Sequence, residues 1–208
     1  MQHDFILLDR SGSMEDKWDE TLSSLNTYVH DLAKQNVDTG VTLITFDDHG
    51  GATFDVIRDR IIPSTWKDVT TTEIQARGGT PLNDSIAKMV TRAKEGFNGV
   101  QYDKVAMIIL TDGMENASKE FPGEAGRLKV EAMLDELRAK NWQIIFIGCD
   151  FDNTVQATSL GNAANQTVNM TIGNMKTAMA STSAKRGLYG ATGQSVNYTE
   201  EEKDQFSK

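Results

Sequence analysis

A carboxylate and two hydroxyls directly follow the first apolar run of the chain. Residues 5–8 are Phe-Ile-Leu-Leu, and the next five are Asp9-Arg10-Ser11-Gly12-Ser13. If the apolar run forms a buried strand, Asp9, Ser11 and Ser13 leave its end together. Carboxylate and hydroxyl oxygens are hard ligands, which suit Mg²⁺, Mn²⁺ or Ca²⁺ better than zinc or copper. The segment therefore predicts a cation site at the end of the first strand.

Two later segments carry matching chemistry. Gly78-Gly79-Thr80-Pro81 precedes a helical pattern, and Thr111-Asp112-Gly113 follows a second apolar run, Val105 to Leu110. Each segment also has an ordinary structural explanation, because such residues cap helices, begin them or form turns. Their joint occurrence in this order, each at a strand end or a helix start, favours a metal site.

The order Asp-x-Ser-x-Ser, then Thr, then Asp-Gly after a strand resembles the metal-ion-dependent adhesion site of von Willebrand factor type A (vWA) domains. The resemblance covers about residues 4–186 and implies a protein-binding module, not an enzyme, in a bacterial or viral system. A partner's Asp or Glu carboxylate would complete the shell of the ion, since Mg²⁺ takes six oxygens. The resemblance implies that the ion is bound, directly or through water, by Asp9, Ser11, Ser13, Thr80 and Asp112.

One residue departs from the integrin β-type version of this motif, in which two consecutive acids build an adjacent calcium site. Asp16 is kept here, but Lys17 stands where the second acid would fall. An adjacent calcium site is therefore not expected. The acidic residues Glu15, Asp16, Asp19 and Glu20 instead indicate a solvated helix start, which the helix dipole favours.

Two further acidic clusters have a metal or partner interpretation and a structural one. Asp47-Asp48-His49 could be an auxiliary metal site, although a turn is the simpler reading. In the segment after position 149, Asp150 is a candidate contact for the partner, and Asp152 or Asn153 is expected to cap the next helix.

The apolar pattern predicts a doubly wound, Rossmann-like α/β fold. Near-continuous apolar runs are typical of parallel strands covered on both faces, and they occur at 5–8, 41–46, 105–110 and 144–147. An alternating segment at 52–56 predicts an antiparallel edge strand, and a sixth strand is expected around 166–170. We therefore expect a mainly parallel six-stranded sheet with one antiparallel edge strand and helices on both faces. In this topology Asp9 and Asp112 face each other over one crevice.

Helical spacing of apolar residues places helices between these strands. They are expected at about 18–32, 82–93, 127–140, 154–160 and 175–185. We expect a vWA domain over 1–187 and a polar tail over 188–208, with a short helix at 199–206 that a Thr199–Glu202 capping box begins. In adhesive vWA domains the last helix shifts when ligand binds. The resemblance implies the same for 175–185, whose apolar face is thin, and a fixed closing helix is the alternative.

Composition restricts the partners. The 208 residues carry a formal net charge of −9, which argues against nucleic acid and anionic membranes. No run approaches the ~18 apolar residues of a spanning helix. Residues 1–4 lead straight into the first strand, so no leader is expected, and Cys149, the single cysteine, suits a reducing compartment. The expected location is the cytoplasm.

Alternative functions stay open at this point. The chain could be an adaptor of a separate MoxR-type AAA+ ATPase or a component of a stress or tellurite-resistance system, and a homo-oligomer is compatible with either. It has no P-loop motif of its own. A metal-dependent hydrolase with Asp9 as nucleophile is disfavoured, because Ser11 stands where the leaving-group acid would be. None of His3, His30 and His49 lies in a recognisable catalytic motif.

Overall fold

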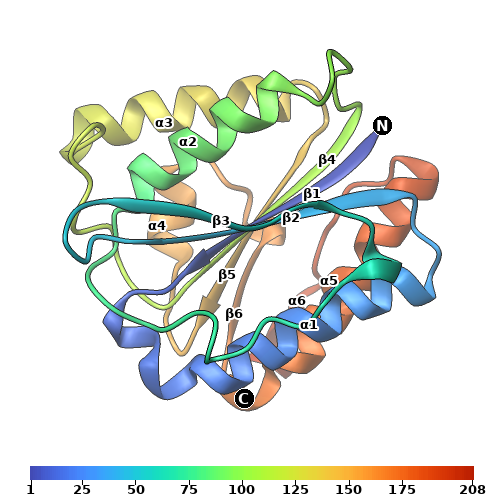
Figure 1. Ribbon diagram of the computed structural model, residues 1–208, viewed down its shortest axis with the longest axis horizontal. Coiled ribbons are helices and arrows are strands. Elements are labelled where there is room, and N and C mark those ends of the chain that lie inside the picture. Colours follow the sequence, from blue (N-terminus) through green and yellow to red (C-terminus); the bar gives the residue numbers. More distant parts are fainter.

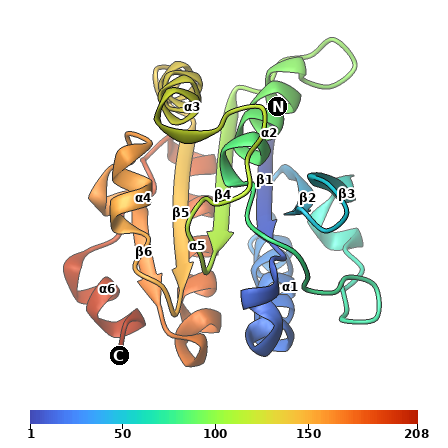
Figure 2. The same ribbon diagram turned by 90° about the vertical axis from the view of Figure 1, so that its left-hand side faces the viewer.

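One mixed sheet of six strands, in the order β3-β2-β1-β4-β5-β6, forms the centre of the computed structural model, which describes residues 1–208. Only the β2–β3 pair is antiparallel, and the other neighbours run parallel. Figure 2 shows the strands side by side from β6 to β3. The predicted sheet is confirmed. Its strands are β1 (Gln2–Asp9), β2 (Thr39–Asp47), β3 (Thr53–Ile61), β4 (Lys104–Thr111), β5 (Gln143–Cys149) and β6 (Thr167–Met170).

Helices cover both faces of this sheet because alternate residues of each strand point to opposite sides. In β1, Phe5 and Leu7 join one apolar core, and Ile6 and Leu8 join the other. The first core packs against α2 (Leu82–Glu95), α3 (Gly123–Arg138) and α4 (Thr154–Ser159). The second core packs against α1 (Trp18–Lys34), α5 (Met175–Thr192) and α6 (Glu200–Phe206). Figure 1 shows α2 and α3 on one side of the sheet and α1, α5 and α6 on the other.

The last long helix, α5, continues past Lys185 to Thr192, so its predicted end is wrong. Gly187 and Gly190 look like helix breakers in the sequence, but both lie where another segment approaches closely. A Cβ at Gly187 would lie 2.3 Å from Gln35 Oε1, and one at Gly190 would lie 2.6 Å from Gln2 Oε1. These glycines therefore allow Gln35 and Gln2 to pack closely against the helix, and they do not end it.

The segment after α5 is less polar in structure than its sequence suggests. Val196, Tyr198 and Phe206 are all buried in the same core as α1 and α5. The predicted short helix is present as α6, and its capping box joins Thr199 and Glu202 as expected. The segment therefore packs on the sheet beside β6 through three apolar side chains.

No helix combines the length and the apolar character needed to cross a membrane.

Candidate functional site

Asp9 ends β1 and is completely buried. One of its carboxylate oxygens accepts a hydrogen bond from the backbone N–H of Ser11 at 2.8 Å, and the other accepts one from Thr111 Oγ1 at 2.6 Å. Both donors are neutral, and no ammonium or guanidinium group pairs with Asp9. Burial raises the pKa of Asp9 to about 6, although these hydrogen bonds oppose the rise. The negative charge on Asp9 is therefore poorly compensated within the protein.

The hydroxyls of the first motif join Asp9 to Asp112. Ser11 Oγ lies 3.1 Å from Ser13 Oγ, and Ser13 Oγ donates to Asp112 Oδ1 at 2.6 Å. The parallel pairing of β1 with β4 explains this proximity, because it brings their carboxyl ends to the same edge of the sheet. Ser11 is buried and Ser13 is exposed, so the cluster opens to solvent on the side of Ser13.

Lys17, at the end of the short 3-10 helix η1 (Gly12–Lys17), adds a cation to the same cluster. Its Nζ lies 2.9 Å from the carbonyl oxygen of Ser13 and 3.1 Å from Asp112 Oδ2. Burial alone would lower the pKa of Lys17, but hydrogen bonds to Asp16 and Asp112 outweigh it and raise the pKa. Lys17 is therefore an ammonium at neutral pH. In the sequence, Lys17 is notable only because it stands where the second acid of an adjacent calcium site would fall.

Thr80 reaches the cluster from the segment before α2. A Cβ built on Gly113 would lie 3.7 Å from Thr80 Oγ1 and 3.9 Å from Ser13 Oγ, so both hydroxyls lie close to Gly113. The backbone of Thr80 is fixed by Asn116, whose Oδ1 accepts the Thr80 N–H at 2.9 Å and whose N–H donates to the Thr80 carbonyl at 3.1 Å. The structure thus gathers all five residues that the sequence analysis proposed as ligands.

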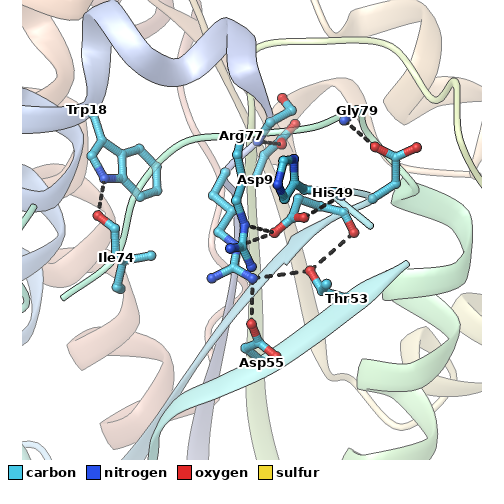
Figure 3. Close-up of polar contacts among 12 residues, drawn as sticks. Asp9, Trp18, His49, Thr53, Asp55, Ile74, Arg77 and Gly79 are labelled. Atoms are coloured by element: carbon cyan, nitrogen blue, oxygen red, sulfur yellow. Dashed lines mark hydrogen bonds and ion pairs between the residues drawn. The ribbon is translucent and has the colours of Figure 1, made fainter. Parts of the chain in front are cut away.

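The long connection between β3 and α2 needs tertiary anchors, because residues 66–81 contain no regular helix or strand. The indole N–H of Trp18 donates to the carbonyl of Ile74 at 2.7 Å, as Figure 3 shows. Further along α1, the Asn26 amide exchanges hydrogen bonds with both backbone groups of Val69. Helix α1 therefore holds the connection that carries Thr80.

A buried arginine, absent from the candidate set, fixes the loop after Asp9. Arg10 pairs with Asp47 at the end of β2 and with Asp55 on β3. Asp47 is completely buried and also accepts the His49 N–H at 2.7 Å and the Arg77 Nε at 3.4 Å. Figure 3 labels Asp55, His49 and Arg77 of this network near Asp9. Hydrogen bonds from His49, Thr53 and Arg10 outweigh burial and lower the pKa of Asp47.

The turn after β2 also holds the glycines before Thr80. The backbone N–H of Gly79 donates to Asp48 Oδ1. Gly78 has a φ of +72°, and a Cβ there would lie 2.7 Å from the His49 nitrogen, so a side chain would be strained both by backbone conformation and by space. Gly78 O in turn accepts the Gly12 N–H at 2.9 Å. Asp47 and Asp48 therefore connect two of the segments that carry proposed ligands.

The auxiliary metal interpretation of Asp47-Asp48-His49 is not supported, because these carboxylates are committed to Arg10, Arg77 and backbone N–H groups. No group of three or more His, Cys, Asp or Glu side chains gathers anywhere in a form that could hold a metal ion. In the segment after β5, Asn153 occupies the N-cap position of α4 but makes no side-chain cap hydrogen bond, and the Asp152 side chain instead accepts the N–H of Thr154, the first helical residue, at 2.9 Å. The Asp150 side chain accepts the Ile172 N–H at 3.2 Å.

The site fits a hard divalent cation in its chemistry. It combines the carboxylates of Asp9 and Asp112 with hydroxyls and contains no sulfur or imidazole, and oxygen-only sets suit Mg²⁺ and Mn²⁺. Asp84 makes a useful comparison. It is also buried without a basic partner, but it accepts backbone N–H groups of Lys119, Glu120 and Phe121. Asp9 accepts one backbone N–H, and its other donors are the neutral hydroxyls of Thr111 and Ser11.

Comparisons with known proteins agree with this architecture. The family model described as von Willebrand factor type A domain matches residues 5–185. The chain therefore belongs to the vWA family, whose members commonly mediate metal-dependent interactions between proteins. No curated protein matches the chain by sequence.

Solved structures show the same fold at low sequence identity. The vWA domain of SpRpn10 superimposes with a TM-score of 0.56 at 12% identity, covering 87% of this chain and 94% of that one. Manganese-loaded TRAP of Plasmodium vivax gives 0.58 at 14% identity, covering 86% and 71%. Proximal thread matrix protein 1 from the mussel byssus, with zinc in its metal-ion-dependent adhesion site (MIDAS), gives a TM-score of 0.58 at 15% identity. The match covers 86% of this chain but spans only 46% of the mussel protein.

Proposed function

We propose that this vWA domain captures an acidic residue of a partner protein through a divalent cation, Mg²⁺ or Mn²⁺. In this proposal Asp9, Ser11, Ser13, Thr80 and Asp112 hold the ion. The observation that carries it is the buried Asp9 carboxylate, which has neutral donors and no basic partner and lies at the inner end of the proposed ligands, all of which are oxygens. The solved vWA structures that contain manganese and zinc support the choice of a divalent ion.

The ion would supply an open coordination position for a carboxylate, and the chain's own residues would bind and position the ion. Asp9 and Asp112 attract the cation, the three hydroxyls fill positions without adding charge, and the loops hold them in place. If Asp9 is the one anion bound directly and Asp112 binds through water, the ion itself keeps about one positive charge for the partner's Asp or Glu. Ser13 lies on the exposed side, where a partner can approach.

The first test is metal binding by the isolated protein. We expect Mn²⁺ to bind and to raise the unfolding temperature, since a ligand that binds only the folded state stabilises it. Asp9→Ala should abolish both effects, whereas Asp19→Asn, an exposed carboxylate at the start of α1, should change neither. Electron paramagnetic resonance counts the free Mn²⁺ directly. Equal Mn²⁺ affinity in the wild type and Asp9→Ala would remove the site from the proposal.

The second test concerns the partner. A pull-down with Mg²⁺, with EDTA and with the Asp9→Ala variant should retain the partner only in the first condition. A separate AAA+ ATPase is one candidate partner: this chain has no P-loop motif, so another protein would have to hydrolyse the ATP. A second copy of this chain is the other candidate. We place the interaction in the cytoplasm because the single cysteine is buried and unpaired.

We expect no turnover by the isolated domain. Ser11 stands two residues after Asp9, where a hydrolase with Asp9 as nucleophile would want an acid. His3, the one buried histidine, bonds Thr42 near the opposite end of β1. Metal-dependent hydrolysis of a phosphoester or peptide panel, lost in Asp9→Ala, would contradict this expectation.

A further inference from the structure

We propose that Lys17 is a built-in second cation of the candidate site, which weakens metal binding and strengthens the capture of a carboxylate by the loaded site. This inference rests on the proposed function. It assigns a role to a residue outside the proposed ligand set, and it predicts opposite changes in two measurable affinities.

The contacts of Lys17 place its charge directly against the proposed ligands. Nζ lies 2.9 Å from the Ser13 carbonyl oxygen and 3.1 Å from Asp112 Oδ2. Ser13 and Asp112 are themselves joined at 2.6 Å. The Lys17 side chain is 15% exposed and that of Asp112 is 2% exposed, so water screens this pair less than it screens a surface pair.

The remaining partner of Lys17 does not neutralise it in the same way. Asp16 Oδ1 lies 3.0 Å from Nζ, but the Asp16 side chain is 81% exposed and well solvated. The buried part of the cluster therefore contains the two anions Asp9 and Asp112 and the single cation Lys17. Its net charge is −1, and a divalent ion changes this to +1. Without Lys17 the loaded cluster would be neutral.

Two consequences follow from this charge balance. A second positive charge next to the ion repels it, so the metal binds less tightly than two carboxylates alone would allow. Once the ion is present, the surplus positive charge attracts a partner's carboxylate. Lys17 thus lowers the affinity for the metal and raises the affinity of the loaded site for the acidic ligand.

The experiment measures both affinities in variants of the full chain. Lys17→Gln removes the charge and keeps a hydrogen-bond donor for Asp112, and Lys17→Arg keeps the charge. Lys34→Met, an exposed lysine in the last turn of α1, is the control for net charge. Free Mn²⁺ is counted by electron paramagnetic resonance. Acetate, the simplest carboxylate, is then titrated against the Mn²⁺-loaded protein, and the loss of water-proton relaxation enhancement reports displacement of bound water.

We expect Lys17→Gln to bind Mn²⁺ about 3- to 30-fold more tightly and the loaded variant to bind acetate about 3- to 10-fold more weakly, as expected for one partly screened charge. Lys17→Arg and Lys34→Met should stay within about twofold of the wild type. Circular dichroism checks folding, and Lys17→Met replaces the Gln variant if that protein does not fold.

The outcomes separate the two proposals. Equal Mn²⁺ binding by the wild type and Asp9→Ala would overturn the metal site and this inference together. Mn²⁺ binding that Asp9→Ala abolishes and Lys17→Gln leaves unchanged or weakens would overturn the role of Lys17 alone. Opposite shifts in the two affinities, with Lys17→Arg close to the wild type, would support it.

Discussion

Strand β1 carries a buried aspartate near each end, and the protein compensates the two charges differently. Near the amino end, Asp4 pairs with the fully buried Arg186 of α5 and accepts a hydrogen bond from Tyr28 at 2.7 Å. At the carboxyl end, Asp9 has hydrogen bonds from neutral groups only. The Asp4 charge is compensated within the fold. In our proposal the Asp9 charge is left for a ligand.

The same comparison bears on the last helix. Its apolar face is thin, as the sequence indicates, but Arg186 ties α5 to Asp4 on β1 and to Thr39 on β2. A buried ion pair is costly to break, because each partner left alone is a charge without compensation. These contacts favour a fixed helix over one that shifts when ligand binds.

The largest effect is expected from Arg186→Met. Removing the arginine leaves Asp4 buried without its cation, so the free energy of unfolding should fall by about 3–5 kcal/mol. Urea denaturation followed by circular dichroism measures it. Lys176→Met, at an exposed position on the same helix, should stay within about 0.5 kcal/mol of the wild type. A loss below about 1 kcal/mol in Arg186→Met would mean that the Asp4 pair does not stabilise the fold.

The second prediction applies one chemical change to both ends of β1. Asp4→Asn should destabilise the protein, because it leaves Arg186 unpaired. Asp9→Asn should stabilise the metal-free protein at pH 7 by about 1–3 kcal/mol, because it removes a charge that burial penalises. Urea denaturation in EDTA tests both variants. The same sign of change at the two positions would contradict the contrast between them.

The third prediction follows the Asp9 charge with pH. The pKa of Asp9 is raised from 3.8 to about 6 in the folded protein, so the folded state holds this proton more tightly than the unfolded state does. The contribution of Asp9 to the free energy of unfolding is therefore fully present at low pH and is lost as the pH rises through 6. In EDTA, the gap between Asp9→Asn and the wild type should grow by up to about 1.4 kcal/mol per pH unit between pH 4 and 6. A gap that does not change with pH would contradict the raised pKa.

The strands and the motif could be predicted because both depend on local sequence. Near-continuous apolar runs mark the central strands, and Asp9, Ser11 and Asp112 stand at the ends of such runs. The end of α5 could not be predicted in this way. Gly187 is in the helix because Gln35 of another segment packs against it, which no local pattern reveals.

The supporting residues of the candidate site were missed for a similar reason. Arg10 occupies a position that the Asp-x-Ser-x-Ser pattern leaves unspecified, so the pattern gives it no role. Its importance depends on Asp47, which is 37 residues away in sequence and was interpreted as part of a turn. Lys17 likewise gains its meaning from Asp112, 95 residues later. An arginine directly after the strand-end acid Asp9 is the one sequence signal that could have suggested the Arg10 pair.

The smallest effect is expected where the support of the site is weakened but its ligands stay intact. Asp47 holds Arg10, which follows Asp9, and Arg77, which precedes the Gly78-Gly79-Thr80 segment. Asp47→Asn should therefore loosen two ligand-bearing segments and weaken Mn²⁺ binding by about 10-fold, at the lower end of the range for residues that orient metal ligands.

Asp55→Asn is the matched control for that variant. Asp55 also pairs with Arg10, but its side chain is 48% exposed and it does not contact Arg77. We expect its Mn²⁺ affinity to stay within about twofold of the wild type, because exposed pairs contribute little. Mn²⁺ titration and urea denaturation of both variants separate affinity from stability. If Asp47→Asn lowers stability and leaves Mn²⁺ affinity unchanged, the Arg10–Asp47 pair belongs with Arg186–Asp4 as part of the fold alone.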